Sequence, residues 1–499
     1  MNLSLELMLQ LCIIIPFLAT FAIVASRRYP NLRESVTLST SLVLIFLVVT
    51  LYQGLSSGKS ISVYWWELLP GLTISFDIEP LGMLFALVAS FLWLVTTCYS
   101  IGYMRSHQEK NQTRFYVCFA VAIGAVMGLA FSANLFTLFI FYEVLTLSTY
   151  PLVTHAGTEK AKKGGRIYLG ILLTTSIVFF LLAIVSTWLV AGTLDFKPGG
   201  IFADDVDKIT ASIILVLFIF GIGKAAIMPF HRWLPAAMVA PTPVSSLLHA
   251  VAVVKAGVFT VLKVCTFIFG LDLLAQLPST QFLLYLAGFS VLIASLIAMR
   301  QDNLKARLAY STVSQLGYIT IGALLATSSG VIGSAMHIAM HAFGKITLFF
   351  CAGAILVAAH KSKISEMHGL GRQMPFTMAA FFIATLSIIG LPPTGGVWSK
   401  WYLLMGTLET EQFIMMTVLM ISSLLNIAYL LPIPFHAFFP KNSNNNDQFP
   451  DSALTQVKIK EAPIPSLIAI GIATLGCLIL FIYPQALYEL AAAVLEQEK

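Results

Sequence analysis

The sequence GIGKAAIMPFHRWLPAAMVAPTPVSSLLHAVAVVKAGVF, residues 221–259, decides the fold. It places Lys224 and Lys255 in apolar helical sequence on either side of a proline-broken segment. A lysine at membrane depth costs about 2.5–3.5 kcal/mol on insertion scales, unless a partner, a water-filled cavity or loss of its proton relieves the charge. We therefore expect both lysines to form part of a proton or ion path. The alternative, snorkelling to an interface, is stronger for Lys224, which lies close to Pro229, than for Lys255.

The composition is that of a polytopic membrane protein. Of 499 residues, 58% are hydrophobic and only 10% are charged, whereas soluble proteins carry about 25% charged residues. The net charge of +6 therefore concerns membrane topology and does not indicate nucleic-acid binding. The six cysteines lie in apolar stretches without CxxC spacing, which favours small core residues over metal ligands or disulfides. No nucleotide, zinc or serine-hydrolase motif occurs in a suitable context, so we expect no cofactor and no metal.

The length of the apolar runs predicts an all-α fold, because a helix needs about 20 apolar residues to cross a bilayer. Two spans should be discontinuous: Pro229 and Pro235 follow the seventh, and Pro392-Pro393 with Gly395-Gly396 interrupt the twelfth. The fourteen expected spans are 4–25, 35–54, 78–102, 113–131, 134–154, 166–191, 210–230, 243–267, 277–299, 309–328, 331–358, 375–409, 411–435 and 463–486.

Lysine and arginine concentrate in the loops after odd-numbered spans, whereas the loops after even-numbered spans hold only Lys59, Lys197 and Lys208. The positive-inside rule then places the odd loops in the cytoplasm and both termini on the outer side. The first apolar run has no basic leader and no A-x-A site, so we expect a retained helix. Residues 440–463 read as a polar connector.

The two broken spans occupy matching positions in two groups of five spans. An odd number of spans turns the second copy upside down, which is a common construction of secondary transporters. The predicted domains are an N-terminal three-helix region (1–112), a first five-helix repeat (113–268), an inverted repeat (277–436), and a polar cytoplasmic loop with a final span (437–499).

Glu143 is the one acidic residue that we place squarely in a span, in FTLFIFYEVLTLSTYPLV. Burial disfavours an ionised carboxylate unless a nearby lysine holds it charged. An ion pair that only locks two helices together is the alternative. Ionisable residues inside a membrane are functional by default, however.

His337, His341 and Lys345 follow an i, i+4, i+8 spacing in SAMHIAMHAFGKITLFF. They therefore share one helix face about 12 Å long. Histidine can relay protons near neutral pH, so a hydrated proton ladder is the preferred interpretation. Hydrogen-bonded core histidines are the main alternative. Zinc is disfavoured because no third or fourth ligand stands at a suitable spacing.

Three further ionisable residues have weaker patterns. Lys400 follows the second break, in GLPPTGGVWSKWYLL, and snorkelling is its rival interpretation. His249 lies in the central stretch as a candidate intermediary for a proton. Lys263 lies close to its helix end, where snorkelling is the favoured interpretation.

Several motifs resemble the antiporter-like subunits of respiratory complex I and, more closely, those of multisubunit Mrp-type Na⁺/H⁺ antiporters. The similarity covers essentially the whole chain. The motifs are FYEVLTLSTYPLV (141–153), KAAIMPFHRWLPAAMVAPTPVSSLLHAVAVVKAGVF (224–259), SQLGYITIG (314–322), HAFGKITLFF (341–350) and GLPPTGGVWSKW (390–401).

The resemblance implies that Glu143 pairs with Lys224, and that Lys255, the His337–Lys345 face and Lys400 then carry a proton across the midplane. In the M-type subunit of complex I a glutamate stands at the place of Lys400, whereas N-type subunits also have a lysine there.

The same resemblance implies a transporter subunit rather than an enzyme. Its partners would be other membrane subunits of a hetero-oligomeric antiporter in the bacterial inner membrane, together with protons and Na⁺ or another monovalent cation. The alternative is a proton-pumping subunit of a redox-driven complex, either complex I-like or a membrane-bound hydrogenase. A scaffold that conducts nothing is disfavoured, because an idle lysine in the membrane is costly.

Overall fold

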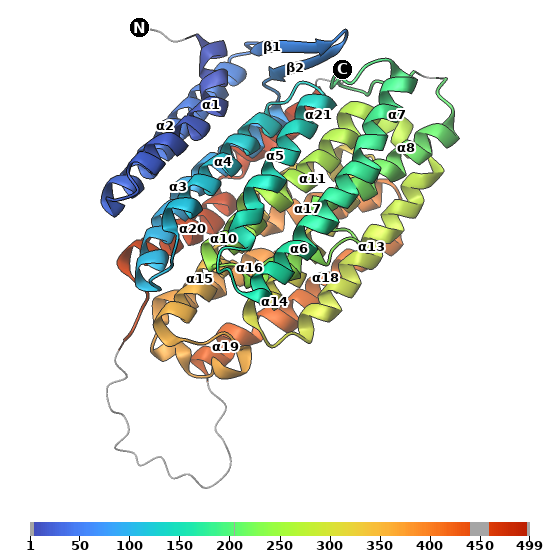
Figure 1. Cartoon of the computed structure of the whole chain (residues 1–499). Coiled ribbons are helices and arrows are strands. Elements are labelled where there is room, and N and C mark those ends of the chain that lie inside the picture. The colour runs from blue at the N-terminus through green and yellow to red at the C-terminus, as the bar shows by residue number, and fades with distance from the viewer. Residues whose placement is uncertain (1–3, 204, 440–458, 497–499) are drawn as a thin grey trace, which may run out of the picture.

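The structure is a computed structural model that describes residues 4–203, 205–439 and 459–496. The described chain is a bundle of helices with one small hairpin (Figure 1). Eleven of its helical stretches are long and apolar enough to cross a membrane by length and composition. They are Leu5–Ala25 (α1), Pro30–Ser56 (α2), Pro80–Ser106 (α3), Gln112–Ala130 (α4), Leu135–Val153 (α5), Glu159–Ala191 (α6, α7), Thr242–Phe269 (α10, α11), Pro278–Met299 (α13), Ser328–Ala359 (α15), Phe413–Phe438 (α18, α19) and Ile464–Ile482 (α20).

The other three predicted spans correspond to shorter or more polar helices. They are Lys208–Gly221 (α8), Leu304–Leu324 (α14), and the pair Pro375–Ile389 (α16) and Gly396–Glu409 (α17). Each of the fourteen predicted spans thus overlaps a helix, and the all-α polytopic fold is confirmed. The connector predicted at 440–463 lies outside the described residues up to position 458. The domain boundaries stay a prediction.

Several helical stretches contain local changes of winding or end in short helices. A wider turn at Thr175–Phe180 joins Glu159–Thr174 (α6) to Leu181–Ala191 (α7). Similar turns at Leu247–Val251 and Cys265–Phe269 flank Val253–Val264 (α11), which follows Thr242–Ser246 (α10). The remaining helices are Trp233–Ala236 (α9), Leu271–Gln276 (α12), Phe413–Leu430 (α18), Pro432–Phe438 (α19) and Gln485–Glu496 (α21).

The first helix break lies earlier than the prolines predict. The sequence predicts that the seventh span continues to Pro229, but α8 ends at Gly221 and a short 3₁₀ turn, Gly223–Ala225, follows. Lys224 is therefore in the break and not within a helix. Ala226 then adopts a left-handed conformation with φ of 55°, which ends the turn.

Close packing against α11 accompanies this early break. A β-carbon on Gly257 would lie 2.3 Å from the carbonyl carbon of Lys224 and 2.4 Å from the amide nitrogen of Ala225. Only a glycine at position 257 lets the Lys224 turn approach α11 so closely. The two lysines of the central stretch are thereby brought onto touching elements, because Gly257 follows Lys255 by half a turn.

The second break is found where the sequence predicts it. Helix α16 ends at Ile389, and Gly390 caps it in a left-handed conformation with φ of 87°. The prolines at 392 and 393 follow, and α17 begins at Gly396. Glycine at the cap and proline just beyond it are the usual means of ending a helix.

A β-hairpin was not predicted in the N-terminal region. Strands Ser62–Leu69 (β1) and Leu72–Asp77 (β2) pair in antiparallel fashion around a turn at Pro70-Gly71. The hairpin and α21 lie at one end of the bundle, and α19 lies at the opposite end (Figure 1). The sequence VYWWELL is rich in residues that favour strands, and Pro-Gly is a turn signal.

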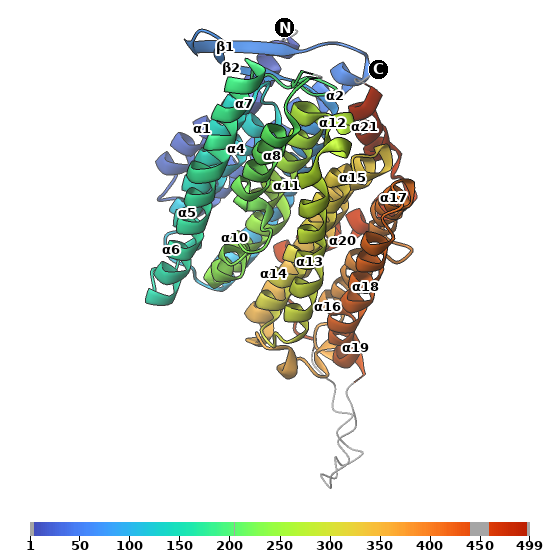
Figure 2. The ribbon, with the colours of Figure 1, turned by 90° about the vertical axis from the view of Figure 1, so that its right-hand side faces the viewer.

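The arrangement of the helices places α11 and α15 centrally. Figure 2 shows α5 to α7 on one side of the bundle and α17 and α18 on the other, with α11 between them. Helix α15, the longest of those described, packs against α3, α14, α16, α17 and α20. In contrast, α1 and α2 lie at the margin (Figure 1), and only a third of each is buried within the chain.

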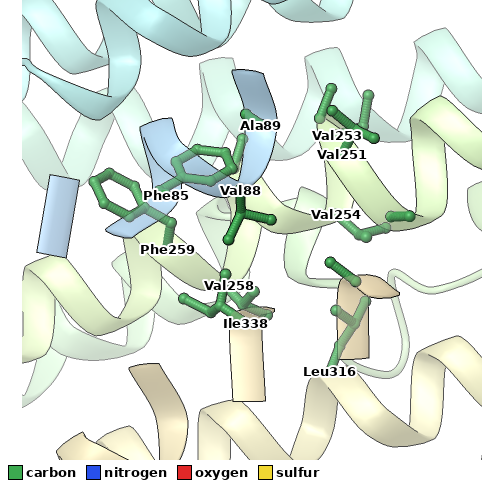
Figure 3. Close-up of a cluster of buried hydrophobic side chains, with 14 of the residues drawn as sticks. Phe85, Val88, Ala89, Val251, Val253, Val254, Val258, Phe259, Leu316 and Ile338 are labelled. Carbon is green, nitrogen blue, oxygen red and sulfur yellow. The ribbon is translucent and has the colours of Figure 1, made fainter. Parts of the chain in front are cut away.

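The surroundings of α11 are apolar (Figure 3). Phe85, Val88 and Ala89 of α3 face Val258 and Phe259 of α11, and Leu316 of α14 and Ile338 of α15 close the cluster. The rings of Phe85 and Phe259 have centroids 5.0 Å apart. A charged group on α11 consequently has few polar neighbours, so those it has must be specific.

We predict that Gly257→Ala destabilises the protein although alanine is the better helix former. The added methyl group meets backbone of the Lys224 turn, and such overpacking costs about 1–3 kcal/mol. Thermal unfolding of the purified complex measures the effect. The matched control is Gly170→Ala in α6, where nothing lies within 4 Å of the new β-carbon. Equal midpoints for both variants would contradict the close approach.

Candidate functional site

The centre of the site is a direct contact between α11 and α15. Lys255 Nζ lies 2.7 Å from His341 Nδ1, and both side chains are buried. His341 in turn stacks on His337 with ring centroids 5.7 Å apart. A lysine and a histidine at this distance share a hydrogen bond along which a proton can pass. The predicted histidine face thus meets Lys255.

His337 extends this chain of contacts toward the second break. Its Nδ1 lies 2.8 Å from Ser399 Oγ of α17, and its Nε2 lies 3.2 Å from Gln315 Oε1 of α14. Both ring nitrogens therefore have hydrogen-bonding partners. Tyr318 also stacks on His337, with ring centroids 5.8 Å apart.

Lys400 lies at the second break and points inward. Its Nζ donates to Ile389 O at 2.9 Å and to Ser423 Oγ at 3.1 Å. Ile389 is the last residue of α16, where the unpaired carbonyl oxygens and the helix dipole favour a cation. The ammonium also lies 4.8 Å from the ring centroid of Tyr318. These contacts disfavour the snorkelling interpretation for Lys400.

Lys224 is held by contacts with two residues of helix α5. Its Nζ donates to Thr146 Oγ1 at 2.6 Å and to Tyr142 O at 2.8 Å. It also lies 3.0 Å from the centroid of the Tyr142 ring. Three interactions with one helix thus stabilise the ammonium, and the two hydrogen bonds use two of its three donors.

Glu143 lies next to this group without touching it. No ion pair within 4 Å joins it to Lys224 among the described residues. Its two carboxylate oxygens are buried, and neither has a hydrogen-bond partner in the described part of the chain. The expected ion pair is therefore not formed in this structure, and the implied role of Glu143 stays a prediction.

Lys345 and His249 stand apart from the central contact. Lys345 Nζ donates to Ser311 Oγ at 2.7 Å and to Leu308 O at 3.2 Å, both on α14. The ring of His249 lies 4.5 Å from that of Phe349. Both nitrogens of His249 are buried and have no hydrogen-bond partner among the described residues. Lys345 therefore shares the helix of the two histidines but bonds to a different neighbour.

The snorkelling interpretation of Lys263 is wrong. Lys263 is buried at the hairpin end of α11, where its Nζ lies 2.6 Å from Glu79 Oε1 and donates to Ser132 O at 2.8 Å. Glu79 is the residue directly before α3. Glu79 precedes Pro80 at the boundary of a predicted span, so the sequence indicates only that a helix begins near this position. The ion pair joins residues far apart in the chain, which no local pattern reports.

Two other buried polar groups have no role predicted from the sequence. Lys305 reaches inward from the start of α14 and donates to Ala240 O at 2.5 Å. Glu34 of α2 is buried and forms ion pairs with Arg105 and Arg33. Neither group contacts the Lys255–His341 centre. In the ranges that the structure describes, no cluster of three or more His, Cys, Asp or Glu side chains is placed to hold a metal ion.

Comparison with known proteins identifies the family. Residues 132–426 match the family described as "NADH:quinone oxidoreductase/Mrp antiporter, TM". Residues 69–116 match "NADH-Ubiquinone oxidoreductase (complex I), chain 5 N-terminus". The structure is thus that of a polytopic membrane protein of the antiporter type. The chain belongs to the NADH:quinone oxidoreductase/Mrp antiporter transmembrane family, whose members are antiporter-like, proton-translocating subunits of Mrp and complex I-like complexes.

Individual relatives cover different shares of the chain. NADH-quinone oxidoreductase subunit N of Desulforudis audaxviator is 32% identical over 434 residues, or 86% of each protein. NAD(P)H-quinone oxidoreductase chain 5 of Synechocystis is 30% identical over 347 residues, which are 66% of this chain and 49% of the relative. The chain therefore spans about half the length of that relative.

Two solved membrane complexes share the fold. A chain in the Mrp complex from Dietzia sp. DQ12-45-1b superimposes with a TM-score of 0.86, covering 99% of this chain and 97% of the other at 22% identity. A chain of the membrane-bound sulfane sulfur reductase, an archaeal respiratory complex, gives 0.82 with 98% and 97% coverage at 22% identity.

We predict that Thr146→Val lowers the thermal stability of the assembled complex. The substitution leaves a buried ammonium without one of its two acceptors, at a cost of about 1–3 kcal/mol. Thermal unfolding of the assembled complex should show the loss. Thr417→Val in α18 is the control, since Thr417 bonds its own helix at Phe413 O and is exposed. The same midpoint in both variants would show that the Thr146 hydroxyl does not support Lys224.

Proposed function

We propose that the chain is the proton-translocating membrane subunit of a multisubunit monovalent cation/proton antiporter that exchanges Na⁺ for protons, and that it is the counterpart of the D-type subunit of Mrp antiporters. The buried line from Lys255 through His341 and His337 toward Lys400 carries this proposal. It joins groups that can take and release protons across the centre of the bundle. Its chemistry requires neither a metal nor a redox cofactor.

In the proposed mechanism, residues in the first half of the chain take up a proton and pass it to Lys255. A proton taken up by Glu143 neutralises the carboxylate that directly follows Tyr142, the residue that Lys224 contacts. The Lys224 ammonium then gives a proton to water near the break and becomes a neutral amine. That proton reaches Lys255, with His249 as a candidate intermediary because its ring nitrogens have no partner among the described residues.

The second half passes the proton onward through existing contacts. Lys255 transfers it to His341 across their 2.7 Å contact. His341 and His337 are stacked, so transfer between them needs a water molecule or a ring rotation. Ser399 and Tyr318 then connect His337 to the surroundings of Lys400. Lys345 can exchange with this line through water, since it lies on the same helix as both histidines.

A redox-driven pump subunit is the second candidate function, and a specific observation favours it. The relatives at 30–32% identity are subunits of NADH-quinone and NAD(P)H-quinone oxidoreductases. The support for the antiporter is the whole-length likeness of fold to a chain in an Mrp complex, whereas the lysine at position 400 separates the chain from M-type subunits of complex I but not from N-type ones. Both functions use the same proton path and differ in what drives it.

The proposed location and partners follow from the family and the surface. The chain would lie in the bacterial inner membrane with both termini on the outer side, because the basic loops gather at the end opposite the hairpin. The exposed apolar side chains of α1, α2 and α18, among them Phe21, Phe46 and Leu424, would face lipid or other membrane subunits of the complex.

We predict that Glu143→Ala or Lys224→Ala abolishes antiport while the complex stays assembled. Removal of either group breaks the loading step, whereas the Lys255–His341 contact remains. The measurement is sodium-dependent ΔpH in everted vesicles from an antiporter-deficient host that expresses the whole operon. Lys160→Ala, at an exposed position in α6, is the matched control and should transport normally. Near-normal transport by either site variant would contradict the mechanism.

The same vesicles separate the two candidate functions. Wild-type complex should respond to sodium without any reductant. Acidification that depends on NADH or hydrogen, with no sodium response, would move the chain to the redox-driven complexes and leave only the proton path intact.

A further inference from the structure

The ion pair between Glu79 and Lys263 lies outside the proposed path from Glu143 to Lys400. It lies at the hairpin end of the bundle, where α3 begins and α11 approaches its end. Glu79 is 8% exposed and Lys263 is fully buried. A buried pair of this kind is weak evidence for stability, because desolvation offsets much of the attraction. Its presence beside a cavity therefore calls for another explanation.

The pair borders a cavity of about 360 Å³. Asp77, Glu79 and Lys263 provide its charged lining, and Ser132 and Phe196 form part of its wall. The volume is enough for several water molecules, each of which occupies about 30 Å³ in the liquid. A carboxylate and an ammonium at such a cavity can exchange protons with water.

A wider cavity leads toward the surface at the same end. It has a volume of about 750 Å³ and is lined by Lys59, Asp77 and residues of α21, including Glu489 and Glu496. Asp77 and Ile78 belong to the walls of both cavities. Asp77 thus stands between an outer vestibule and the Glu79–Lys263 pair.

The two acids of the inner cavity lie outside the membrane-spanning segments and resist ionisation. Burial raises the pKa of the Glu79 carboxyl, an effect that Lys263 opposes and Asp77 reinforces. Burial also raises the pKa of Asp77, again opposed by Lys263. Both acids therefore take up protons at higher pH than free side chains do. Among the described residues, Lys263 and Asp77 are the charged groups that act on Glu79.

Helix α11 links this pair to the centre of the site. Lys255 and Lys263 are eight residues apart, so they lie on similar faces about 12 Å apart along the helix. Phe259 lies between them, packed on Phe85 (Figure 3). Lys263 Nζ is 5.5 Å from the centroid of the Phe259 ring. Phe259 thus lies between the two lysines along α11.

We propose that Asp77, Glu79 and Lys263 form the proton-exchange site through which the buried path meets water on the hairpin side, with Phe259 as the barrier between them. This inference rests on the proposed proton translocation. The ligand of the site is a proton delivered by water, and the vestibule beside α21 is its entrance.

The exchange step is balanced without any further reactant. A hydronium ion in the cavity gives its proton to the Glu79 carboxylate, which leaves a water molecule and a neutral acid. Lys263 then loses its ion pair with Glu79 and keeps the hydrogen bond to Ser132 O and the contact with the Phe196 ring. Its ammonium can therefore release a proton to water on the Phe259 side and is recharged from Glu79. The reverse order delivers a proton from the path to the surface.

The test is the double variant Glu79→Gln with Lys263→Gln in the whole complex. It removes both charges and leaves two amides that can hydrogen-bond to each other. If the role of the pair is purely structural, these amides should replace it. We expect an assembled complex whose initial transport rate is at least about 10-fold lower. Glu79→Asp, which keeps a carboxyl, should retain most of the rate. The exposed hairpin variant Glu67→Gln should match the wild type.

The dependence of the rate on pH gives a second readout. The wild type and Glu79→Asp should change rate as the hairpin-side pH crosses the range in which the acid titrates. Glu79→Gln should lose this change of rate with pH, because an amide does not titrate. Transport by the double variant at half the wild-type rate or more, or its failure to assemble, would overturn the exchange site.

Failure of this inference can be told from failure of the proposed function. Loss of transport in Glu143→Ala, together with normal transport in the double variant, would overturn the exchange site alone. Normal transport in both would overturn proton translocation by this chain.

Discussion

The cost of burying a lysine cation is the constraint on which the structure depends. Lys224, Lys255, Lys345 and Lys400 are all buried within the bundle, where a charge without polar partners is costly. Each has specific partners: hydroxyls and carbonyls for Lys224, Lys345 and Lys400, and a histidine for Lys255. These partners can accept a hydrogen bond from the charged form of each lysine. They therefore stabilise a proton inside the bundle and still allow the lysine to release it.

The helix breaks supply part of these partners. At the second break, the last carbonyl of α16 turns to Lys400 in place of the next turn of helix. At the first break, Lys224 leaves the helix altogether and reaches α5, while Gly257 brings α11 against the same turn. In a continuous helix these carbonyl oxygens would be used by hydrogen bonds within the helix. The breaks thus place the two lysine side chains in addition to interrupting the helices.

Sequence reasoning predicted the helices, the second break and the helix face that His337 and His341 share. These features follow from apolar length and helical periodicity, which are local properties. The first break includes the predicted Pro229, but it begins earlier, after Gly221, where the Lys224 turn packs against Gly257 of α11. The hairpin was missed because a search for long apolar runs passes over short aromatic strands. The Glu79–Lys263 pair was missed because it joins distant segments. Among the predicted site residues, Glu143 lies beside Lys224 without contact, and its role is a matter for transport measurements.

The contact between Lys255 and His341 offers the most direct measurement of the central claim. His341→Gln keeps an oxygen that can accept a hydrogen bond from Lys255, yet an amide cannot take up and release a proton near neutral pH. The initial rate of sodium-dependent ΔpH should be measured in vesicles that contain equal amounts of assembled wild-type or variant complex. The account predicts that the variant assembles and loses nearly all transport. A rate close to that of the wild type would show that the proton does not pass through His341, and would contradict the account.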